Sequence, residues 1–268
     1  MQGWPLTPIH AGRRIPMTQI AMVTGATAGF GKAIAERLVH DGYRVIATGR
    51  RQERLDALAG RLGPALLPFR LDMDDAAAIA ALPDSLPEAW REVDVLINNA
   101  GLALGMDRAQ EADIANWRTM ISTNATGMVE LTRVLLPGMV ARDRGHIVSL
   151  GSTAGIYPYT GGNVYGATKA FVRQFMRNLR CDLLGHNVRV TNLEPGLCGG
   201  SEFSNVRLRD DAKAAAVYEG TKPLLPADIA GTVAWVLSLP RHVNINEIEM
   251  MPTCQAAGGL AVARGMKD

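Results

Sequence analysis

The residues best able to do chemistry are a serine, a tyrosine and a lysine in the second half of the chain. Ser152 follows a short apolar run, Tyr165 stands thirteen residues after it, and Lys169 comes four residues later. A four-residue step puts Tyr165 and Lys169 on one face of a helix. A lysine ammonium near a phenol favours the phenolate and lowers the pKa of the tyrosine, which suits an acid or base. The trio predicts proton transfer, although such a pair by itself also fits an ordinary contact on a helix surface.

Ser152 could instead act as a nucleophile. No G-x-S-x-G motif surrounds it, and none of the five histidines is placed by the pattern to activate it. The sequence therefore disfavours nucleophilic catalysis. Asn124 is a further candidate for a functional role, because asparagine is a poor helix former and this one stands inside a predicted helix.

A glycine-rich segment near the start of the chain could hold a phosphate. Residues 24–31 read TGATAGFG and follow the first apolar run. Glycines let the backbone turn sharply and approach a pyrophosphate, while the free N–H groups at a helix start attract its charge. Packing alone can also produce such a turn, but its place between a strand and a helix favours the phosphate. The predicted contacts are Gly25, Thr27, Ala28, Gly29, Phe30 and Gly31.

Two arginines follow the second predicted strand, where a domain that prefers NAD would place a carboxylate for the ribose 2′-hydroxyl. Arg50 and Arg51 begin a helix, and cations there oppose the helix dipole, so a bound anion would explain them. The 2′-phosphate of NADP fits; a solvated basic helix start is the alternative. Asp72, after the third strand, is placed to accept a hydrogen bond from the adenine amino group, although an ordinary loop aspartate fits as well.

These residues must be positioned by an alternation of strands and helices. Seven short runs predict buried strands, at 20–24, 44–48, 65–71, 93–97, 146–150, 188–193 and 245–250. Segments of helical period lie between them, at 32–39, 53–61, 117–141, 164–184 and 227–239. The alternation predicts a single α/β domain: a Rossmann-type, doubly wound, parallel seven-stranded sheet with helices on both faces. Its ligands should lie outside the carboxyl ends of the strands.

Composition excludes several other classes of protein. The chain has 268 residues, a net charge of +2, three widely spaced cysteines and five histidines without ligand spacing. We therefore expect one domain, no metal site, no nucleic-acid partner and a reduced, cytoplasmic protein. No apolar run reaches the ~18 residues of a spanning helix, so no membrane partner is expected.

The first sixteen residues contain three prolines and no continuous apolar stretch. We interpret residues 1–16 as an N-terminal extension, either a flexible tail or the product of a misplaced start, with an organelle signal as the alternative. The domain itself is expected to span residues 17–268.

Taken together, these residues and the segments 98–101 (NNAG) and 195–196 (PG) resemble the short-chain dehydrogenase/reductase family, and the resemblance covers residues 20–251. Four stretches are similar to NADP-dependent 3-hydroxy acid dehydrogenases, a subgroup that includes malonic semialdehyde reductases. They are GRRQERL at 49–55, NNAGLALGM at 98–106, GGNVYGATKAFVRQF at 161–175 and EFSNVR at 202–207. The chain departs from the pattern at Cys198, at Ile156 and Tyr157, and in its extension, which concerns substrate preference rather than reaction class.

The resemblance implies the roles of the candidate residues. Ser152 would bind the substrate oxygen, Tyr165 would move the hydroxyl proton as hydride leaves carbon, and Lys169 would hold the nicotinamide ribose. Asn124 would open its helix to seat a relay water. The substrates would be small 3-hydroxy acids such as serine, allo-threonine or 3-hydroxypropionate, and the assembly a homotetramer. The further cofactor contacts implied are Asn99, Ala100, Gly101, Tyr165, Lys169, Pro195, Gly196 and Leu197.

A small acid needs a cation in its pocket. Arg207 follows the Pro-Gly segment and is our candidate for a bidentate partner of the substrate carboxylate; Arg209, a surface role or a cofactor contact are alternatives. The stretch that continues to residues 212–214 could close as a lid. Two other functions stay open: reduction of a different small carbonyl compound, and NADP binding by a catalytically silent regulator.

The long helix predicted at 117–141 is apolar around roughly two-thirds of its circumference. One side of a sheet cannot cover so wide a face. We therefore predict a symmetric oligomer in which these helices meet.

Overall fold

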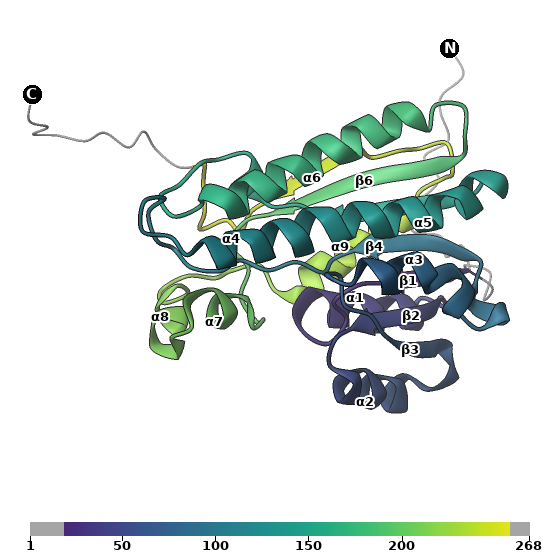
Figure 1. Ribbon diagram of the computed structural model, residues 1–268, viewed down its shortest axis with the longest axis horizontal. Helices are drawn as coiled ribbons and strands as arrows, with labels where there is room; N and C mark the ends of the chain where they lie inside the picture. The colour runs from purple at the N-terminus through teal and green to yellow at the C-terminus, as the bar shows by residue number, and fades with distance from the viewer. Residues whose placement is uncertain (1–18, 258–268) are drawn as a thin grey trace, which may run out of the picture.

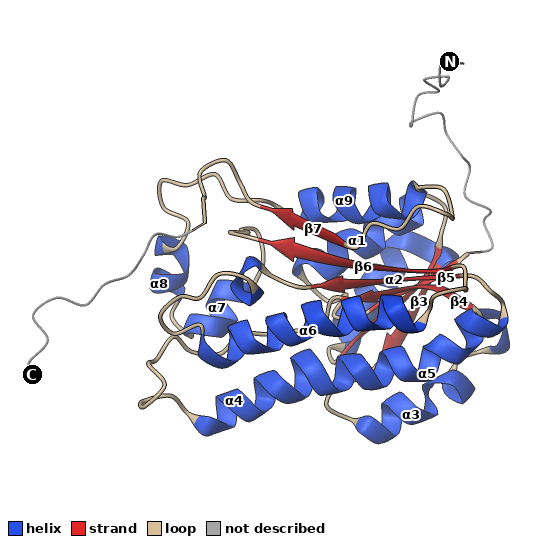
Figure 2. Ribbon diagram, turned by 90° about the horizontal axis from the view of Figure 1, so that it is seen from above, coloured by secondary structure: helices blue, strands red, loops and turns tan. Residues whose placement is uncertain are grey.

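The strands of the protein form one parallel sheet in the computed structural model, which describes residues 19–257 (Figure 1). Figure 2 shows this sheet edge-on between two layers of helices. The strand order is β3-β2-β1-β4-β5-β6-β7. The chain therefore leaves the sheet after β3 and re-enters beside β1, which creates a crevice between the ends of β1 and β4. The strands are β1 Ile20–Val23, β2 Arg44–Gly49, β3 Leu66–Arg70, β4 Val93–Asn98, β5 Gly145–Leu150, β6 Val188–Pro195 and β7 Glu247–Met250.

The central strands are buried on both faces, which explains why they read as continuous apolar runs. Alternate side chains enter different cores because the side-chain period of a strand is two. Met22 and Leu96 join the core on one face, whereas Val23 and Ile97 join the core on the other.

Helices cover both faces of the sheet (Figure 2). One layer holds α1 (Gly29–His40), α2 (Gln52–Leu62) and α9 (Pro226–Ser238). The opposite layer holds α3 (Ala76–Ser85), α5 (Gly127–Ala141) and α6 (Asn163–Asp182). The helix α4 (Ile114–Ile121) runs into α5 through a π-helical turn, Ser122–Thr126. Two short helices, α7 (Phe203–Leu208) and α8 (Asp211–Ala216), lie beyond the arrowheads of the strands, where ligands are expected.

The Rossmann-type fold predicted from the sequence is confirmed, with all seven strands and all five predicted helices present. The prediction missed α3, α7 and α8. Half of the residues of helix α3 are alanine, and it buries only Ile79 and Leu82, so it lacks a periodic apolar stripe; Pro83 stands in its last turn. The prediction of one uninterrupted helix from 117 to 141 was wrong, because the π turn divides it.

Helix α3, which was not predicted, covers part of the apolar face of α5. Val129, Val134 and Leu136 are partly buried against the core that α3 and α6 share with α5, so much of the face is covered within the chain. Ile121, at the end of α4, stays 48% exposed.

The predicted N-terminal extension, residues 1–16, lies outside the described residues, as do residues 17, 18 and 258–268. Between residues 19 and 257, the structure contains no helix with the length and hydropathy needed to cross a membrane.

Gly127, at the start of α5, offers a test of this packing. A Cβ atom there would overlap Met73 O, so Gly127→Ala should lower the free energy of unfolding by about 1–3 kcal/mol. Gly231, inside α9, has no atom near its missing side chain, so Gly231→Ala should raise that free energy by about 0.5–1 kcal/mol. Urea denaturation of the two variants measures both effects; a neutral Gly127→Ala would contradict the close approach.

Candidate active site

The glycine turn after β1 presents unpaired backbone donors to a cleft. Gly25 and Gly29 have positive φ angles of 67° and 51°, a conformation that glycine adopts without strain. The next helix, α1, begins at Ala28 without a side-chain cap and carries no acidic residue in its first turn. Its first N–H groups are therefore free to bind an anion, which is the donor set that a pyrophosphate requires.

The glycine turn is tied to the loop after β4. Thr24 Oγ1 accepts hydrogen bonds from Asn99 N at 3.0 Å and from Ala100 N at 2.9 Å. In return, Asn99 Nδ2 donates to Thr24 O at 2.7 Å. The packing is close, since a Cβ atom at Gly25 would lie 2.9 Å from Asn99 Nδ2 and one at Gly31 would overlap Gly25 O. Gly31 therefore permits helix α1 to approach the turn.

A cleft of about 350 Å³ opens at this junction. Arg50 and Arg51 line it where α2 begins, and Arg51 donates to Thr27 Oγ1 through Nη2 at 2.8 Å and Nε at 3.2 Å. Asp72 lines it after β3. The remaining residues predicted to touch the cofactor and found along this cleft are Gly25, Thr27, Ala28, Gly29, Phe30, Asn99, Ala100, Gly101, Tyr165, Lys169 and Pro195.

Asn124 lies at the centre of the π turn between α4 and α5. Its Oδ1 accepts from Leu102 N at 2.8 Å, and its Nδ2 donates to Leu102 O at 2.8 Å and to Thr168 Oγ1 at 3.1 Å. The buried carboxamide thus fixes the loop after β4 against α6. The irregular helix that the asparagine signalled in the sequence is present.

Tyr165 and Lys169 project from α6 towards the cleft, as their four-residue spacing predicts. Lys169 Nζ donates to Leu150 O at 2.7 Å and lies 5.8 Å from the centre of the Tyr165 ring. Burial raises the pKa of Tyr165 to about 12, while the Ser152 hydroxyl and the Arg207 guanidinium oppose that rise. Burial also lowers the pKa of Lys169 to about 8. The expectation that Lys169 would lower the tyrosine pKa is not met in the protein alone: the groups that lower it are Ser152 and Arg207, and desolvation outweighs them.

A second cavity, of about 480 Å³, adjoins the cleft and shares Tyr165, Gly151 and Phe203 with it. Ser152 lines this cavity, and so do Gly196 and Leu197, which we had expected along the cofactor cleft. A reacting group bound between the two spaces would lie beside Ser152 and Tyr165. Such contiguity is what hydride transfer between a cofactor and a substrate needs.

Arg207 projects from α7 into the second cavity. Its Nη2 donates to Tyr159 Oη at 2.8 Å, and its guanidinium carbon lies 5.4 Å from the centre of the Tyr165 ring. Along the described chain, Arg207 is the only lysine or arginine that lines this cavity. Its rival Arg209 lines neither space and donates instead to Asn116 Oδ1 at 3.1 Å.

Two aromatic residues of this cavity, Tyr159 and Phe203, were not predicted from the sequence. Tyr159 contacts Arg207, and Phe203 packs against Tyr165 with ring centres 5.8 Å apart. The one signal for Tyr159 was an aromatic side chain in a loop rich in proline and glycine between Ser152 and Tyr165.

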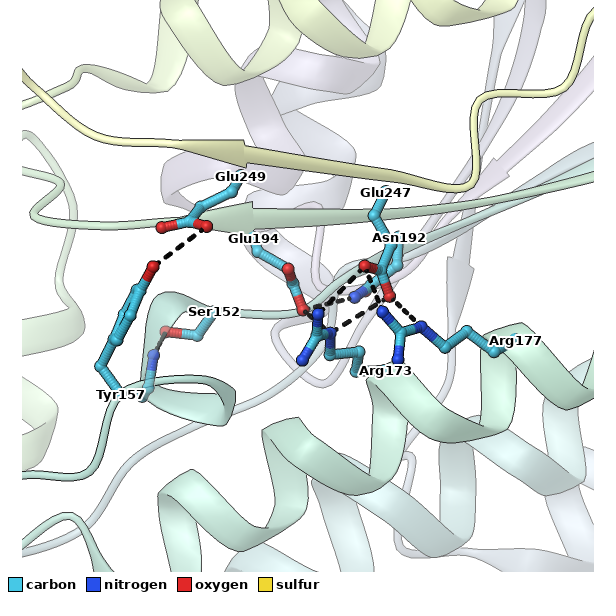
Figure 3. A network of polar contacts seen from close by, with 9 residues as sticks. Ser152, Tyr157, Arg173, Arg177, Asn192, Glu194, Glu247 and Glu249 are labelled. Carbon is cyan, nitrogen blue, oxygen red and sulfur yellow. Dashed lines mark hydrogen bonds and ion pairs between the residues drawn. The ribbon is translucent and has the colours of Figure 1, made fainter. Parts of the chain in front are cut away.

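A charged network supports the turn that carries Ser152 (Figure 3). Glu194 on β6 is 1% exposed, accepts from Asn192 Nδ2 at 2.9 Å and lies 3.4 Å from Arg173 Nε. A Cβ atom at Gly151 would lie 3.1 Å from Glu194 Cγ, so the carboxyl sits directly behind the turn. Arg173 is shared with Glu247, which also pairs with Arg177.

The carboxylates of this network outnumber its cations. Among residues 19–257, the cations that face Glu194, Glu247 and Glu249 are Arg173 and Arg177, while Glu249 also accepts a hydrogen bond from Tyr157. Burial and the two neighbouring carboxylates raise the pKa of Glu194 to about 7, although Arg173 lowers it. The site is therefore backed by a carboxyl group that titrates near neutral pH.

A doubly wound sheet with this glycine turn and a serine, tyrosine and lysine at its carboxyl edge defines a class of oxidoreductases. The chain belongs to the short chain dehydrogenase family, whose pattern matches residues 19–211. The resemblance seen in the sequence is confirmed.

Among relatives, the NADP-dependent 3-hydroxy acid dehydrogenase YdfG of Salmonella typhi is 59% identical over 246 residues, which cover 91% of this chain and 99% of the relative. The serine 3-dehydrogenase of Agrobacterium fabrum is 47% identical, with 92% and 99% covered. The closed form of a serine dehydrogenase complexed with NADP⁺ superposes with a TM-score of 0.91 at 57% identity, covering 92% of this chain and 100% of that one.

The pKa of Glu194 predicts a dependence of stability on pH. Because the folded state binds this proton more tightly than the usual value of 4.5 implies, the free energy of unfolding should fall as pH rises from 4.5 to about 7. In Glu194→Gln this loss of stability is absent, because glutamine does not titrate. The Tm of the variant minus the Tm of the parent should therefore be larger at pH 8 than at pH 5, by the equivalent of roughly 1–3 kcal/mol.

Calorimetry from pH 5 to pH 8 measures the difference, with Glu88→Gln, an exposed glutamate outside the network, as the control. A Tm difference between Glu194→Gln and the parent that stays constant with pH would contradict the raised pKa.

Proposed function

We propose that this protein is an NADP-dependent 3-hydroxy acid dehydrogenase, which interconverts a small 3-hydroxy acid and its 3-oxo acid or semialdehyde. The observation that carries the proposal is Arg207, the single cation along the described wall of the substrate cavity. A guanidinium so placed can bind a carboxylate through two hydrogen bonds while the hydroxyl-bearing carbon lies near Tyr165. The names of the relatives from Salmonella typhi and Agrobacterium fabrum point to the same substrate class.

NADP is the cofactor, and the cleft suits it. The uncapped start of α1 would hold the pyrophosphate, and Arg50 and Arg51 would hold the 2′-phosphate. We assign Asp72 to the adenine and the loop from Asn99 to Gly101 to the adjoining ribose, with Pro195, Gly196 and Leu197 near the nicotinamide. Gly101 lies close to two of the candidate residues, because a Cβ atom there would lie 3.2 Å from Asn124 Oδ1 and 3.5 Å from Lys169 Nζ.

The chemistry needs one proton and one hydride. NADP supplies the carbon that accepts or gives the hydride and, when oxidised, a positive charge near the tyrosine. In oxidation, the phenolate of Tyr165 takes the hydroxyl proton while Ser152 donates a hydrogen bond to the same oxygen. In reduction, the Tyr165 hydroxyl donates that proton to the carbonyl oxygen. Lys169 would bind the nicotinamide ribose, and Asn124 would position the loop at Leu102 and a relay water.

Two other functions use the same fold: reduction of a neutral carbonyl compound, and NADP binding without catalysis. The absorbance of NADPH distinguishes these functions in two assays. The oxidation assay combines NADP⁺ with L-serine, allo-threonine or 3-hydroxypropionate, and the reduction assay combines NADPH with malonic semialdehyde or a neutral ketone. We expect turnover of the acids and semialdehyde. Turnover of the neutral ketone alone would select the first alternative, and NADPH binding without turnover would select the second.

Tyr165→Phe should reduce kcat at least about 100-fold with little change in the Kd for NADPH, because it removes only the proton-transferring oxygen. Since burial raises the pKa of Tyr165, the parent enzyme should oxidise faster as pH rises from 7 to 10. Steady-state kinetics and NADPH fluorescence titration measure both effects. A phenylalanine variant that keeps most of its turnover would assign the proton transfer to another group.

Arg207→Met should raise KM for the hydroxy acid at least about 30-fold, since one partner of a charged pair is lost. Arg209→Met is the matched control, because Arg209 lies outside both cavities and should leave KM unchanged. Equal KM values in the parent and in Arg207→Met would show that Arg207 does not bind a carboxylate of the substrate.

We also infer a homo-oligomer, a homotetramer by likeness to the family. Ile114, Ile121 and Phe171, on α4 and α6, are 55%, 48% and 45% exposed, which supports burial of this surface in an assembly. The cysteines Cys181, Cys198 and Cys254 are free, as suits a reducing compartment, and we propose the cytoplasm.

A further inference from the structure

Glu202, just before α7, is joined to two arginines that lie about 150 positions away in the sequence. Its Oε2 accepts from Arg51 Nη1 at 2.9 Å, and its Oε1 accepts from Arg54 Nη1 at 2.8 Å. Hydrogen bonds from these guanidinium groups lower the pKa of the Glu202 carboxyl. The carboxylate therefore bridges the start of α7 and the start of α2.

The segment around Glu202 lies across the cofactor cleft. Glu202 lines the cleft, whereas Ser201 and Phe203 line both the cleft and the substrate cavity. Ser201 packs onto the glycine turn, since a Cβ atom at Gly29 would lie 3.0 Å from Ser201 Cβ. Arg51, which holds Glu202, also donates to Thr27 in that turn. Opening this edge of the cleft thus requires the contacts of Glu202 to break.

The same segment carries the groups that face the substrate. Phe203 packs against the ring of Tyr165, and Arg207 lies one helical turn further along α7, beside Tyr159. Glu202 is the N-cap of α7, which has only six residues, so it is joined to Phe203 and Arg207 by less than two turns of helix. The position of Glu202 is therefore transmitted directly to Phe203 and Arg207.

We propose that Glu202 is a positioning residue: by binding Arg51 and Arg54, it closes segment 201–208 over the cofactor and sets Arg207 for the substrate carboxylate. This proposal rests on the proposed function, in which Arg51 binds the 2′-phosphate. Arg51 would then bind both the 2′-phosphate and Glu202. The phosphate that distinguishes NADP from NAD would lie beside the ion pair that holds segment 201–208 closed. The cofactor end of the cleft and the substrate cavity are coupled through α7.

An ordinary surface ion pair is the alternative, and its effects would differ. The three side chains are 39–46% exposed, so their pairing adds little to global stability. A contact that holds a lid instead changes local opening, which hydrogen exchange detects residue by residue. It also changes KM for the substrate more than the affinity for the cofactor.

The test compares Glu202→Gln and Arg54→Met with a matched control on the same helix. Arg61→Met breaks the pair between Arg61 and Glu36, which touches neither cavity. In the free protein, amides of segment 201–208 should exchange about 3- to 10-fold faster in Glu202→Gln and Arg54→Met but not in Arg61→Met. The double variant should match Glu202→Gln, because Arg54 has no carboxylate left to bind once Glu202 is replaced.

Kinetics of the full-length enzyme give the second readout. Glu202→Gln should raise KM for the hydroxy acid about 3- to 10-fold, while the Kd for NADPH stays equal or falls, since a carboxylate beside a phosphate is lost. Unchanged exchange in segment 201–208 would overturn the proposal, and so would a raised Kd for NADPH with an unchanged KM. The exchange experiment needs no turnover, so it decides the role of Glu202 even if the enzyme ignores every hydroxy acid and the proposed function fails.

Discussion

The contact between the loops after β1 and β4 is the constraint on which the whole site depends. The Thr24 hydroxyl receives the N–H groups of Asn99 and Ala100, and the Asn99 carboxamide returns a bond to Thr24 O. This junction lies where the strand order reverses, so the crevice at the carboxyl edge opens beside it. The glycine turn, the loop after β4 and, through Asn124, helix α6 are fixed relative to one another. The positions of Tyr165 and Lys169 follow from that arrangement.

Burial decides the acid–base properties of the groups held there. Tyr165, Lys169 and Glu194 are each no more than 7% exposed, and each has its pKa moved towards the neutral form. A tyrosine that keeps its proton is suited to protonating a carbonyl oxygen. The reverse direction depends on positive charge nearby, which Arg207 contributes from the substrate side.

The segment after β6 contacts both the proposed cofactor site and the proposed substrate site, which are formed by residues far apart in the sequence. Its acidic residue, Glu202, meets the arginines at the start of α2, and its arginine, Arg207, meets the tyrosines of the substrate cavity. Glu202, at the N-cap of α7, lines the cofactor cleft, and Arg207, within α7, lines the substrate cavity.

The sequence by itself determined the seven strands, the glycine turn and the candidate residues Ser152, Tyr165 and Lys169, because each depends on local period or on its place after a strand. Only the tertiary structure separated Arg207 from Arg209: Arg207 lies within α7 and lines the cavity, whereas Arg209 follows the end of α7 with a left-handed backbone and binds Asn116 instead. It alone showed the pairing of Glu202 with Arg54, 148 positions apart. It also reversed the expected pKa shift of Tyr165, because desolvation depends on every segment packed around a group, and no spacing along the chain encodes that sum.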